Sequence, residues 1–326
     1  MSSSPKTLKS TPATNPDLVG SLAVLAATAC WATSALFVKL ILASQDVSAL
    51  ALAFWRDLAT FVTLSVGLGI LRPKWLRIKR EDIGWLVGLG ASIGIFHIFW
   101  NLAVFLNGAA VATVQQAAMP AVVAIVAWLI WRESLTGRKG LAIVLTFAGT
   151  VLVCGINVIG QADLTLPGLL VGLLLPITYA AWNLFVKKVR GTYNPFTALT
   201  YGFGFAALVL LPVQLFTPQP SGLPASVFLY FLGLVGISTI GGFAIYTSAL
   251  GRLQASVASI LAMAEIPIVG IYAILLIGER MTIDQLIGSA LVVGGVLLLS
   301  WRRRHPESTN PVRGEGTYST VTDSGP

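Results

Sequence analysis

The stretch WATSALFVK at residues 31–39 has a counterpart, YAAWNLFVK, at residues 179–187. Both end in Leu-Phe-Val-Lys, and an aromatic residue precedes that motif at the same spacing. A second pair, WRESLT at 131–136 and IGERMT at 277–282, is separated by 146 residues, against 148 for the first pair. The chain therefore contains two related halves, and we expect both to adopt the same fold.

The composition places these halves in a membrane. Of the 326 residues, 56% are hydrophobic and only 10% are charged, and the mean hydropathy is +0.82. Soluble domains carry about 25% charged residues, so a soluble enzyme and a disordered chain are both excluded, and most of the surface must face lipid. Because a spanning helix takes about 20 residues, we predict ten, at residues 18–40, 47–71, 83–106, 109–131, 140–159, 168–186, 196–216, 225–250, 255–277 and 283–301.

The number of helices in each half decides how the halves are related. Five is odd, so the second half must enter the membrane from the opposite side. We predict an all-α polytopic membrane protein whose ten transmembrane helices form two inverted five-helix repeats, residues 18–159 and 160–301, as is typical of carriers with two near-mirror states. A cleaved signal peptide ending near Ala29 is the competing interpretation of the first helix. It is the weaker one, because the apolar run continues to Lys39.

The basic residues indicate the orientation. With the N-terminus in the cytoplasm, 18 of the 21 Lys and Arg residues fall in cytoplasmic segments, as the positive-inside rule requires. We expect the ends of the chain, residues 1–17 and 302–326, to be disordered cytoplasmic tails because they are rich in polar residues and proline. The formal net charge of +8 then reflects topology and does not indicate a nucleic acid partner.

Several motifs in this order resemble the EamA family of the drug/metabolite transporter superfamily, over residues 18–301. They are the paired Trp/Tyr-to-Lys motifs, the two elements of the form Arg/Gly-Glu-x-Leu/Met-Thr before a Gly-rich helix, and Ala-Glu-Ile-Pro at residues 264–267. The last is similar to a Glu-Pro element of that family, with one residue inserted. The resemblance implies a bacterial inner-membrane carrier that exports metabolites, amino acids or drugs, and it leaves the substrate open.

Three ionisable residues lie at membrane depth: Arg56, Asp57 and Glu265. Placing such a group at the bilayer centre costs about 2.5–3.5 kcal/mol in free energy of insertion, unless the group faces a water-filled cavity or a partner. We predict that Glu265 contacts the substrate or binds a proton in a central cavity, and that Arg56, Asp57 and Glu265 serve coupling or gating. The alternative for Arg56 and Asp57 is a structural ion pair with a neighbouring helix.

Polar and aromatic side chains within the predicted helices are the other candidates for the substrate site. Aromatic rings offer apolar and cation–π surface, and amides orient polar groups. The alternative is that these side chains sit at the membrane interface or join helices. The predicted substrate-binding residues are Trp31, His97, Trp100, Asn101, Gln115, Gln116, Met119, Tyr179, Trp182, Asn183, Tyr246 and Glu265.

Proline and glycine mark where these helices bend or pack. Pro120, Pro176 and Pro267 fall inside predicted helices, where each can produce a kink. Glycine pairs four residues apart allow close helix contact. These pairs are Gly84 and Gly88, Gly90 and Gly94, and Gly168 and Gly172.

Other classes of function find little support. Residues 90–94 match the G-x-S-x-G pattern of hydrolases, but they lie in an apolar helix and not in a strand–turn–helix elbow. Cys30 and Cys154 form no metal-binding pattern and the chain has no P-loop, so we expect no metal and no cofactor.

The sequence therefore predicts a secondary transporter, not an enzyme, that exports a small metabolite, amino acid or amphipathic drug by alternating access. The expected partners are the solute, protons or a counter-substrate, and membrane lipid, while monomer and homodimer both stay open. The alternatives are uptake by the same fold, an intramembrane hydrolase and a passive channel.

Overall fold

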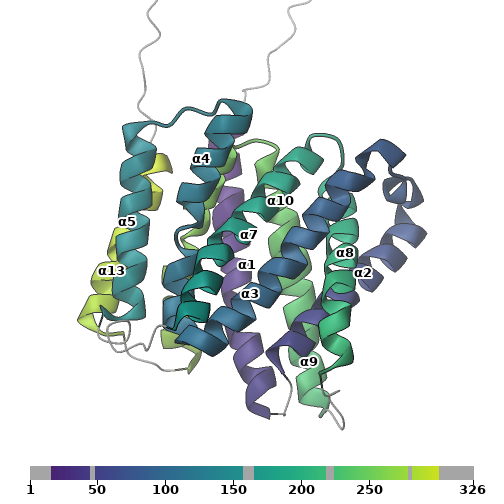
Figure 1. The fold of residues 1–326 in the computed structure, drawn as a ribbon, viewed down its shortest axis with the longest axis horizontal. Helices are drawn as coiled ribbons and strands as arrows, with labels where there is room; N and C mark the ends of the chain where they lie inside the picture. The colour runs from purple at the N-terminus through teal and green to yellow at the C-terminus, as the bar shows by residue number, and fades with distance from the viewer. Residues whose placement is uncertain (1–15, 45–47, 157–164, 218–223, 278–280, 301–326) are drawn as a thin grey trace, which may run out of the picture.

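The computed structural model describes residues 16–44, 48–156, 165–217, 224–277 and 281–300, and this part of the chain is helical with no strand. Nine stretches are long and apolar enough to cross a membrane, and α13 (Ile283–Ser300) is a further, shorter apolar helix. The predicted all-α polytopic fold is confirmed (Figure 1).

The helix bounds lie close to the predicted ones for most of the chain. The first half contains α1 (Pro16–Ser44), α2 (Ala49–Leu71), the 3-10 turns η1 (Pro73–Leu76) and η2 (Arg80–Asp82), α3 (Ile83–Gln116), α4 (Met119–Trp131) and α5 (Gly137–Cys154). The second half contains α7 (Leu166–Arg190), α8 (Pro195–Leu215), α9 (Ala225–Gly233), η3 (Leu234–Gly242), α10 (Phe243–Leu250), α11 (Ala255–Ala262), α12 (Glu265–Tyr272), η4 (Ala273–Ile277) and α13.

Polar side chains set where several of these helices begin. The oxygen atoms of Ser48, Thr136, Thr165 and Asn194 each accept a hydrogen bond from a backbone N–H in the first turn of the following helix. Such caps satisfy donors that the helix itself leaves unpaired. The loops between spans therefore hold the polar residues that end one helix and start the next.

Three predicted helices differ from the structure. The helix α3 continues through the expected break after Asn107. The third membrane span nevertheless ends at Asn107, and the fourth begins at Val111. The amide of Asn107 nonetheless donates to Gln115 at 3.1 Å, whereas eight residues of straight helix rise about 12 Å, so the chain turns back here. The predicted helix 225–250 contains a π-helical centre, η3, and the predicted helix 255–277 is broken before α12 and ends in the π-helical η4.

The two repeats pack across each other. α1 lies against η3, α10 and α12 of the second repeat, and α7 lies against α3 and α4 of the first. The first helix of each repeat therefore contacts the third and fourth spans of the other, as an inverted pair requires. At the side of the bundle α5 and α13 run close together (Figure 1).

Glycines permit the closest of these contacts. A Cβ on Gly149 or Gly288 would stand 2.6 Å from the backbone oxygen of the other glycine, and a Cβ on Gly90 would stand 2.3 Å from Phe205. Gly88, Gly94, Gly168 and Gly172 are similarly covered. Gly84 is the exception among the predicted packing glycines, because it faces open space.

Four loops meet at one end of the bundle, which we call the basic end. The hydroxyl of Tyr201 donates to the carbonyl of Leu76 at 2.6 Å, Lys187 donates to the carbonyls of Leu250 and Leu253, and Arg138 donates to the carbonyl of Leu298. These contacts join the loop after α2 to α8, the last turn of α7 to the loop after α10, and the first turn of α5 to the last turn of α13. Most of the Lys and Arg residues of the described chain lie in these loops or in the helix turns that flank them.

Candidate functional site

Two transmembrane helices are interrupted at equivalent positions of the two repeats. The helix breaks at residues 117–118, before α4, and again 146 residues later at 263–264, before α12. Pro120 and Pro267 lie in the first turn of the helix that follows each break, where a missing backbone N–H costs no helical hydrogen bond. Pro176 lies inside α7 as predicted. Discontinuous helices of this kind are where transporters build midplane binding sites.

Glu265 begins α12, at the position that Met119 takes in α4. It follows Ala255, the first residue of α11, by ten residues, or about 15 Å of helix, which is half of a hydrocarbon core about 30 Å thick. Its side chain is half-buried, and in the described part of the chain nothing hydrogen-bonds or pairs with its carboxylate. The carboxylate lies at the N-terminus of α12, where the helix dipole favours a negative charge.

Five aromatic rings meet beside this carboxylate at the centre of the bundle. Trp31, Tyr179, Trp182, Phe243 and Tyr246, which we call the aromatic core, have neighbouring ring centroids 4.9 to 6.0 Å apart. Tyr179 lies near enough to Glu265 to interact with its charge. The indole N–H of Trp31 is buried and has no hydrogen-bond partner among the described residues. Four of the five rings are predicted site residues, whereas Phe243 is hidden in the sequence by its apolar neighbours.

A buried amide connects the aromatic core to the other broken helix. Asn183 is fully buried, and its side-chain oxygen accepts a hydrogen bond from the hydroxyl of Tyr246. Its nitrogen lies 3.9 Å from the sulfur of Met119 and 3.4 Å from the carbonyl oxygen of Tyr179. Six of the predicted substrate-binding residues are therefore brought together from α1, α4, α7 and α10.

The charged residues of α2 form a separate cluster with α3. Nδ1 of His97 donates to Asp57 at 2.9 Å, and Nε2 of His97 accepts from Arg56 at 2.5 Å. Arg56 also lies 3.4 Å from the other oxygen of Asp57. Asp57 is fully buried and Arg56 retains 18% exposure of its side chain. His97 is therefore placed with Arg56 and Asp57, which provide its hydrogen-bond partners.

The remaining predicted residues lie outside the aromatic core. Asn101 donates to the carbonyl of His97 in its own helix, and the ring of Trp100 stands 6.4 Å from Phe96. Gln115 binds Asn107 near the start of α7, and Gln116 is the half-buried last residue of α3. We find no shared site for these four side chains.

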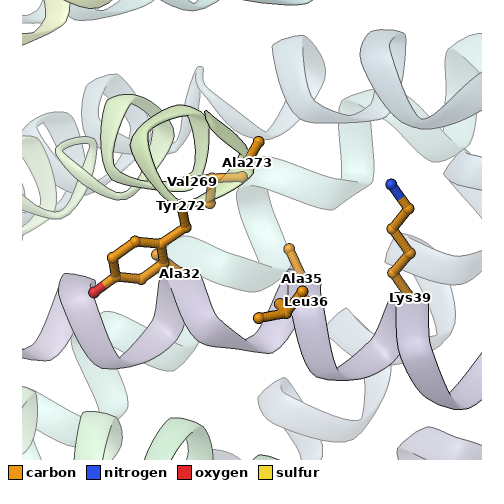
Figure 2. Close-up of a pocket in the computed structure, with 7 residues that line it drawn as sticks. All are labelled: Ala32, Ala35, Leu36, Lys39, Val269, Tyr272 and Ala273. Atoms are coloured by element: carbon orange, nitrogen blue, oxygen red, sulfur yellow. The ribbon is translucent and has the colours of Figure 1, made fainter. Parts of the chain in front are cut away.

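A cavity of about 140 Å³ lies between α1 and α12 (Figure 2). On one side it is lined by Val269 and Tyr272 of α12 and by Ala273, the first residue of η4, which continue the helix face that Glu265 begins. On α1 it reaches Lys39, nineteen residues or about 28 Å after Gly20, which packs on the basic end against Leu253. The cavity therefore lies towards the end of the bundle opposite the basic end. Tyr272 is not among the predicted site residues, although its spacing from Glu265 places both on one helix face.

The basic end is closed by a buried contact between the repeats. The carboxylate of Glu133, after α4, accepts hydrogen bonds from the backbone N–H groups of Ala255 and Ser256 at 3.0 and 3.3 Å and from the hydroxyl of Ser256 at 2.5 Å. Lys139 donates to Gln254 and Ser256, each at 2.8 Å. Glu133 and Lys139 are 8% and 5% exposed. Glu133 therefore caps α11 across the repeat boundary, and we call this contact the latch.

The same sequence profile matches the chain twice. A profile described as the EamA-like transporter family fits residues 18–155 and again residues 166–301, and these two matches cover most of the chain. The chain belongs to the EamA-like transporter family. Each copy of the profile covers one five-helix half, in agreement with the inverted arrangement of the helices.

Curated relatives of this EamA-like chain are named as transporters. An uncharacterized inner membrane transporter, YicL, from Salmonella typhimurium LT2 is 25% identical over 286 residues, covering 86% of this chain and 95% of the relative. The uncharacterized transporter YwfM from Bacillus subtilis 168 is 27% identical and covers 86% and 93%. An uncharacterized transporter from Archaeoglobus fulgidus is 26% identical and covers 70% and 81%. A crystal structure that is 21% identical has the same fold, with a TM-score of 0.68 over 88% of this chain and 97% of the other.

The hydrolase-like pattern takes a different structure in this EamA-like fold. Ser92 lies inside α3, and its hydroxyl donates to the carbonyl of Leu89 in the same helix at 2.7 Å. A hydrolase nucleophile requires a strained turn between strand and helix, and that turn is not found here. The described residues also contain no group of three His, Cys, Asp or Glu residues that could hold a metal ion.

Proposed function

We propose that this EamA-like chain is a secondary transporter of the cell membrane that exports a small solute by alternating access, with both termini in the cytoplasm. One observation carries the proposal. The basic end is closed by the buried latch between the two repeats, while the cavity beside α12 lies towards the opposite end. A bundle closed at one end and hollowed towards the other corresponds to one of the two states of a carrier.

The repeats, residues 18–159 and 160–301, would rock against each other about the broken helices α4 and α12. The orientation rests on the basic end, whose Lys and Arg residues favour the cytoplasmic side under the positive-inside rule. The family resemblance supports export. In the state described here, the solute site would then be reached from outside the cell.

The substrate we infer is small and amphipathic, such as a metabolite, an amino acid or a drug. The aromatic core offers apolar and π surface, Asn183 offers an amide, and Glu265 offers a carboxylate that no described residue engages. Rings and one anionic group together suit a solute with a cationic or strongly polar end. Protons or a counter-substrate would drive transport, with Glu265 and the cluster of Arg56, Asp57 and His97 as the groups that bind or respond to them.

Solute counterflow in proteoliposomes tests this proposal. Proteoliposomes that contain the purified chain are loaded with one unlabelled solute from a panel of amino acids, nucleosides and cationic drugs. Uptake of the same solute in labelled form is then followed at two pH values. We expect transient, saturable accumulation of at least one solute, recovered chemically unchanged. Conductance without saturation, or chemical conversion of the solute, would contradict a carrier.

Two matched variants link transport to the site. Glu265→Gln removes the half-buried carboxylate of α12, and Glu81→Gln removes a carboxylate in η2 whose side chain is 73% exposed. We expect Glu265→Gln to lower transport or abolish its pH dependence and Glu81→Gln to leave both unchanged. Full rate and full pH dependence in Glu265→Gln would remove Glu265 from the mechanism.

A further inference from the structure

A second hollow lies on the outer surface of the bundle, between α2 and α8, which run side by side (Figure 1). It has a volume of about 420 Å³, and its walls are apolar side chains, among them Phe54, Phe61, Phe205 and Leu208. Gly204 forms part of its floor, because a Cβ there would stand 2.7 Å from the ring of Phe61. We call this hollow the α2–α8 groove.

The groove lies at the depth of lipid acyl chains. Tyr201, which lines it, stands six residues into α8, or about 9 Å from the start of that helix at the basic end. Leu211 lines the groove ten residues, or about 15 Å, further on. One leaflet of the hydrocarbon core is about 15 Å thick, so the groove extends into that layer.

A basic segment borders the basic-end side of this groove. The segment, residues 72–77, follows α2 and contains η1 (Pro73–Leu76), and the hydroxyl of Tyr201 donates to the carbonyl of Leu76 at 2.6 Å. Thr197 also donates to the carbonyl of Trp75 at 2.7 Å. Tyr201 therefore belongs to both the groove and the support of the segment, and the two features have a fixed relative position.

The charges of this segment have no acidic partner in the part of the chain that the structure describes. Arg72, Lys74 and Arg77 are exposed, and within the described residues none of them forms an ion pair. Trp75 lies beside them, with the guanidinium of Arg72 over its ring at 6.0 Å. Tryptophan and basic residues together are typical of the head-group region of a membrane.

We propose that the α2–α8 groove and the basic segment after α2 form a binding site for one anionic phospholipid. An acyl chain would occupy the groove, and the phosphate and any further anionic head group would lie against Arg72, Lys74 and Arg77. A second copy of the chain is a poorer occupant, because a two-fold contact at this face would bring two like-charged segments together. The site is independent of the transported solute.

Lipid retention by the purified chain tests the site. Delipidated protein in detergent is titrated with dioleoylphosphatidylglycerol or dioleoylphosphatidylcholine, and bound lipids are counted by native mass spectrometry. We expect one phosphatidylglycerol to be retained in preference to phosphatidylcholine. Equal retention of both lipids, or a dimer that forms through this face in place of lipid, would overturn the proposal.

Two pairs of variants distinguish binding at this site from the general electrostatic attraction of anionic lipids to a basic protein. Arg72→Gln with Lys74→Gln should lower the preference for the anionic lipid by up to roughly thirtyfold, since each basic residue near an anionic surface contributes about a fivefold factor. Arg132→Gln with Arg252→Gln removes the same charge elsewhere at the basic end and should change little. An equal loss of the preference for anionic lipid in both pairs would show that the preference depends on net charge alone, which would contradict a site at this segment.

The groove itself is tested by filling it. Leu208 is 60% exposed in the groove, and Leu173 is 66% exposed on α7. Leu208→Trp should abolish retention of the bound lipid, whereas Leu173→Trp should keep it. If Leu208→Trp retained the lipid, or if both variants lost it, the acyl chain would not lie in the α2–α8 groove.

Discussion

Arg56, Asp57 and His97 hold charge in the middle of a membrane by pairing donors with acceptors. A guanidinium only donates hydrogen bonds and a carboxylate only accepts them. The ring of His97 between them must therefore accept at Nε2 and donate at Nδ1, as the two distances indicate. The cluster joins α2 to α3, which fits both the predicted gating role and the structural alternative.

The tautomer of His97 can be measured because the chain has only two histidines. We predict that nitrogen NMR of the protein labelled with ¹⁵N-histidine shows a bare Nε2 and a protonated Nδ1 for His97 near pH 8. The variant His305→Gln assigns the signals. A protonated Nε2 at that pH would contradict the arrangement of the cluster.

Asp57→Asn should destabilise the fold. The amide oxygen still accepts from His97, but the charge that balances Arg56 is lost, and removing one partner of a buried pair costs on the order of 3 kcal/mol. The control is Asp284→Asn, an exposed acid in the first turn of α13, which should cost under about 1 kcal/mol. Thermal unfolding in detergent compares the two, and equal midpoints would argue against a buried charge pair.

Glu133 shows which contacts between the repeats the sequence conceals. It lies at a helix end, where an acidic residue is usually solvated, and its partners Ala255 and Ser256 are 122 and 123 residues away. The available signal was the repeat itself, because Glu133 belongs to the duplicated motif at 131–136 and 277–282. Residues 278–280 of the second copy lie outside the described part of the chain.

Among the elements, the contact between α5 and α13 depends on glycines, which have no side chain to hold the two helices apart. Gly149 and Gly288 bring the two backbones together, and a Cβ on Gly288 would also stand 2.8 Å from the backbone nitrogen of Val153. Backbone atoms cannot move aside as the end of a flexible side chain can. The contact between these helices is therefore sensitive to a single methyl group.

We predict that Gly288→Ala lowers the free energy of unfolding by about 1–3 kcal/mol through overpacking. The matched control is Gly294→Ala on the same helix, where no atom lies within 4 Å of the added Cβ. Alanine favours helix over glycine by up to about 1 kcal/mol, so this control should be neutral or slightly stabilising. Equal unfolding midpoints for the two variants would contradict the close contact of α5 and α13.

The π-helical centre of the eighth span, η3, could not be predicted from sequence. Hydropathy distinguishes lipid from water, and both an α-helix and a π-helix satisfy the backbone within the segment. The hydroxyl of Thr239 bonds the carbonyl of Leu234, five residues earlier, and α1 packs against this element. Its wider winding therefore follows from tertiary packing. The ten spans, by contrast, were predictable because apolar length and Gly/Pro breaks are local properties.

At the scale of the whole molecule, the duplicated motifs and the odd number of spans per half were enough to predict the inverted repeat. Within those motifs Trp31 and Tyr179 occupy equivalent positions, and the structure places both in the aromatic core at the middle of the bundle. The sequence left open which end is closed, since that depends on contacts such as the latch, formed between repeats that are far apart in the chain. The separation of basic end from cavity is visible only in three dimensions.

The latch is the contact whose removal tests alternating access most directly. Glu133→Ala leaves two backbone N–H groups of α11 without their carboxylate acceptor, a loss of about 1–3 kcal/mol for a buried donor. If the two repeats exchange between two states, this loss weakens only the state that is closed at the basic end. The variant should shift the population by roughly tenfold or more.

Spin-label distances measured by pulsed electron resonance test this claim. One pair, Arg132→Cys with Arg252→Cys, reports on the basic end, and a second, Ser48→Cys with Leu166→Cys, reports on the opposite end, both in a chain whose Cys30 and Cys154 are replaced by alanine. We predict that Glu133→Ala adds a population in which the first distance is longer and the second is shorter. Distances that stay unchanged, or that lengthen together at both ends, would contradict alternating access between the two repeats.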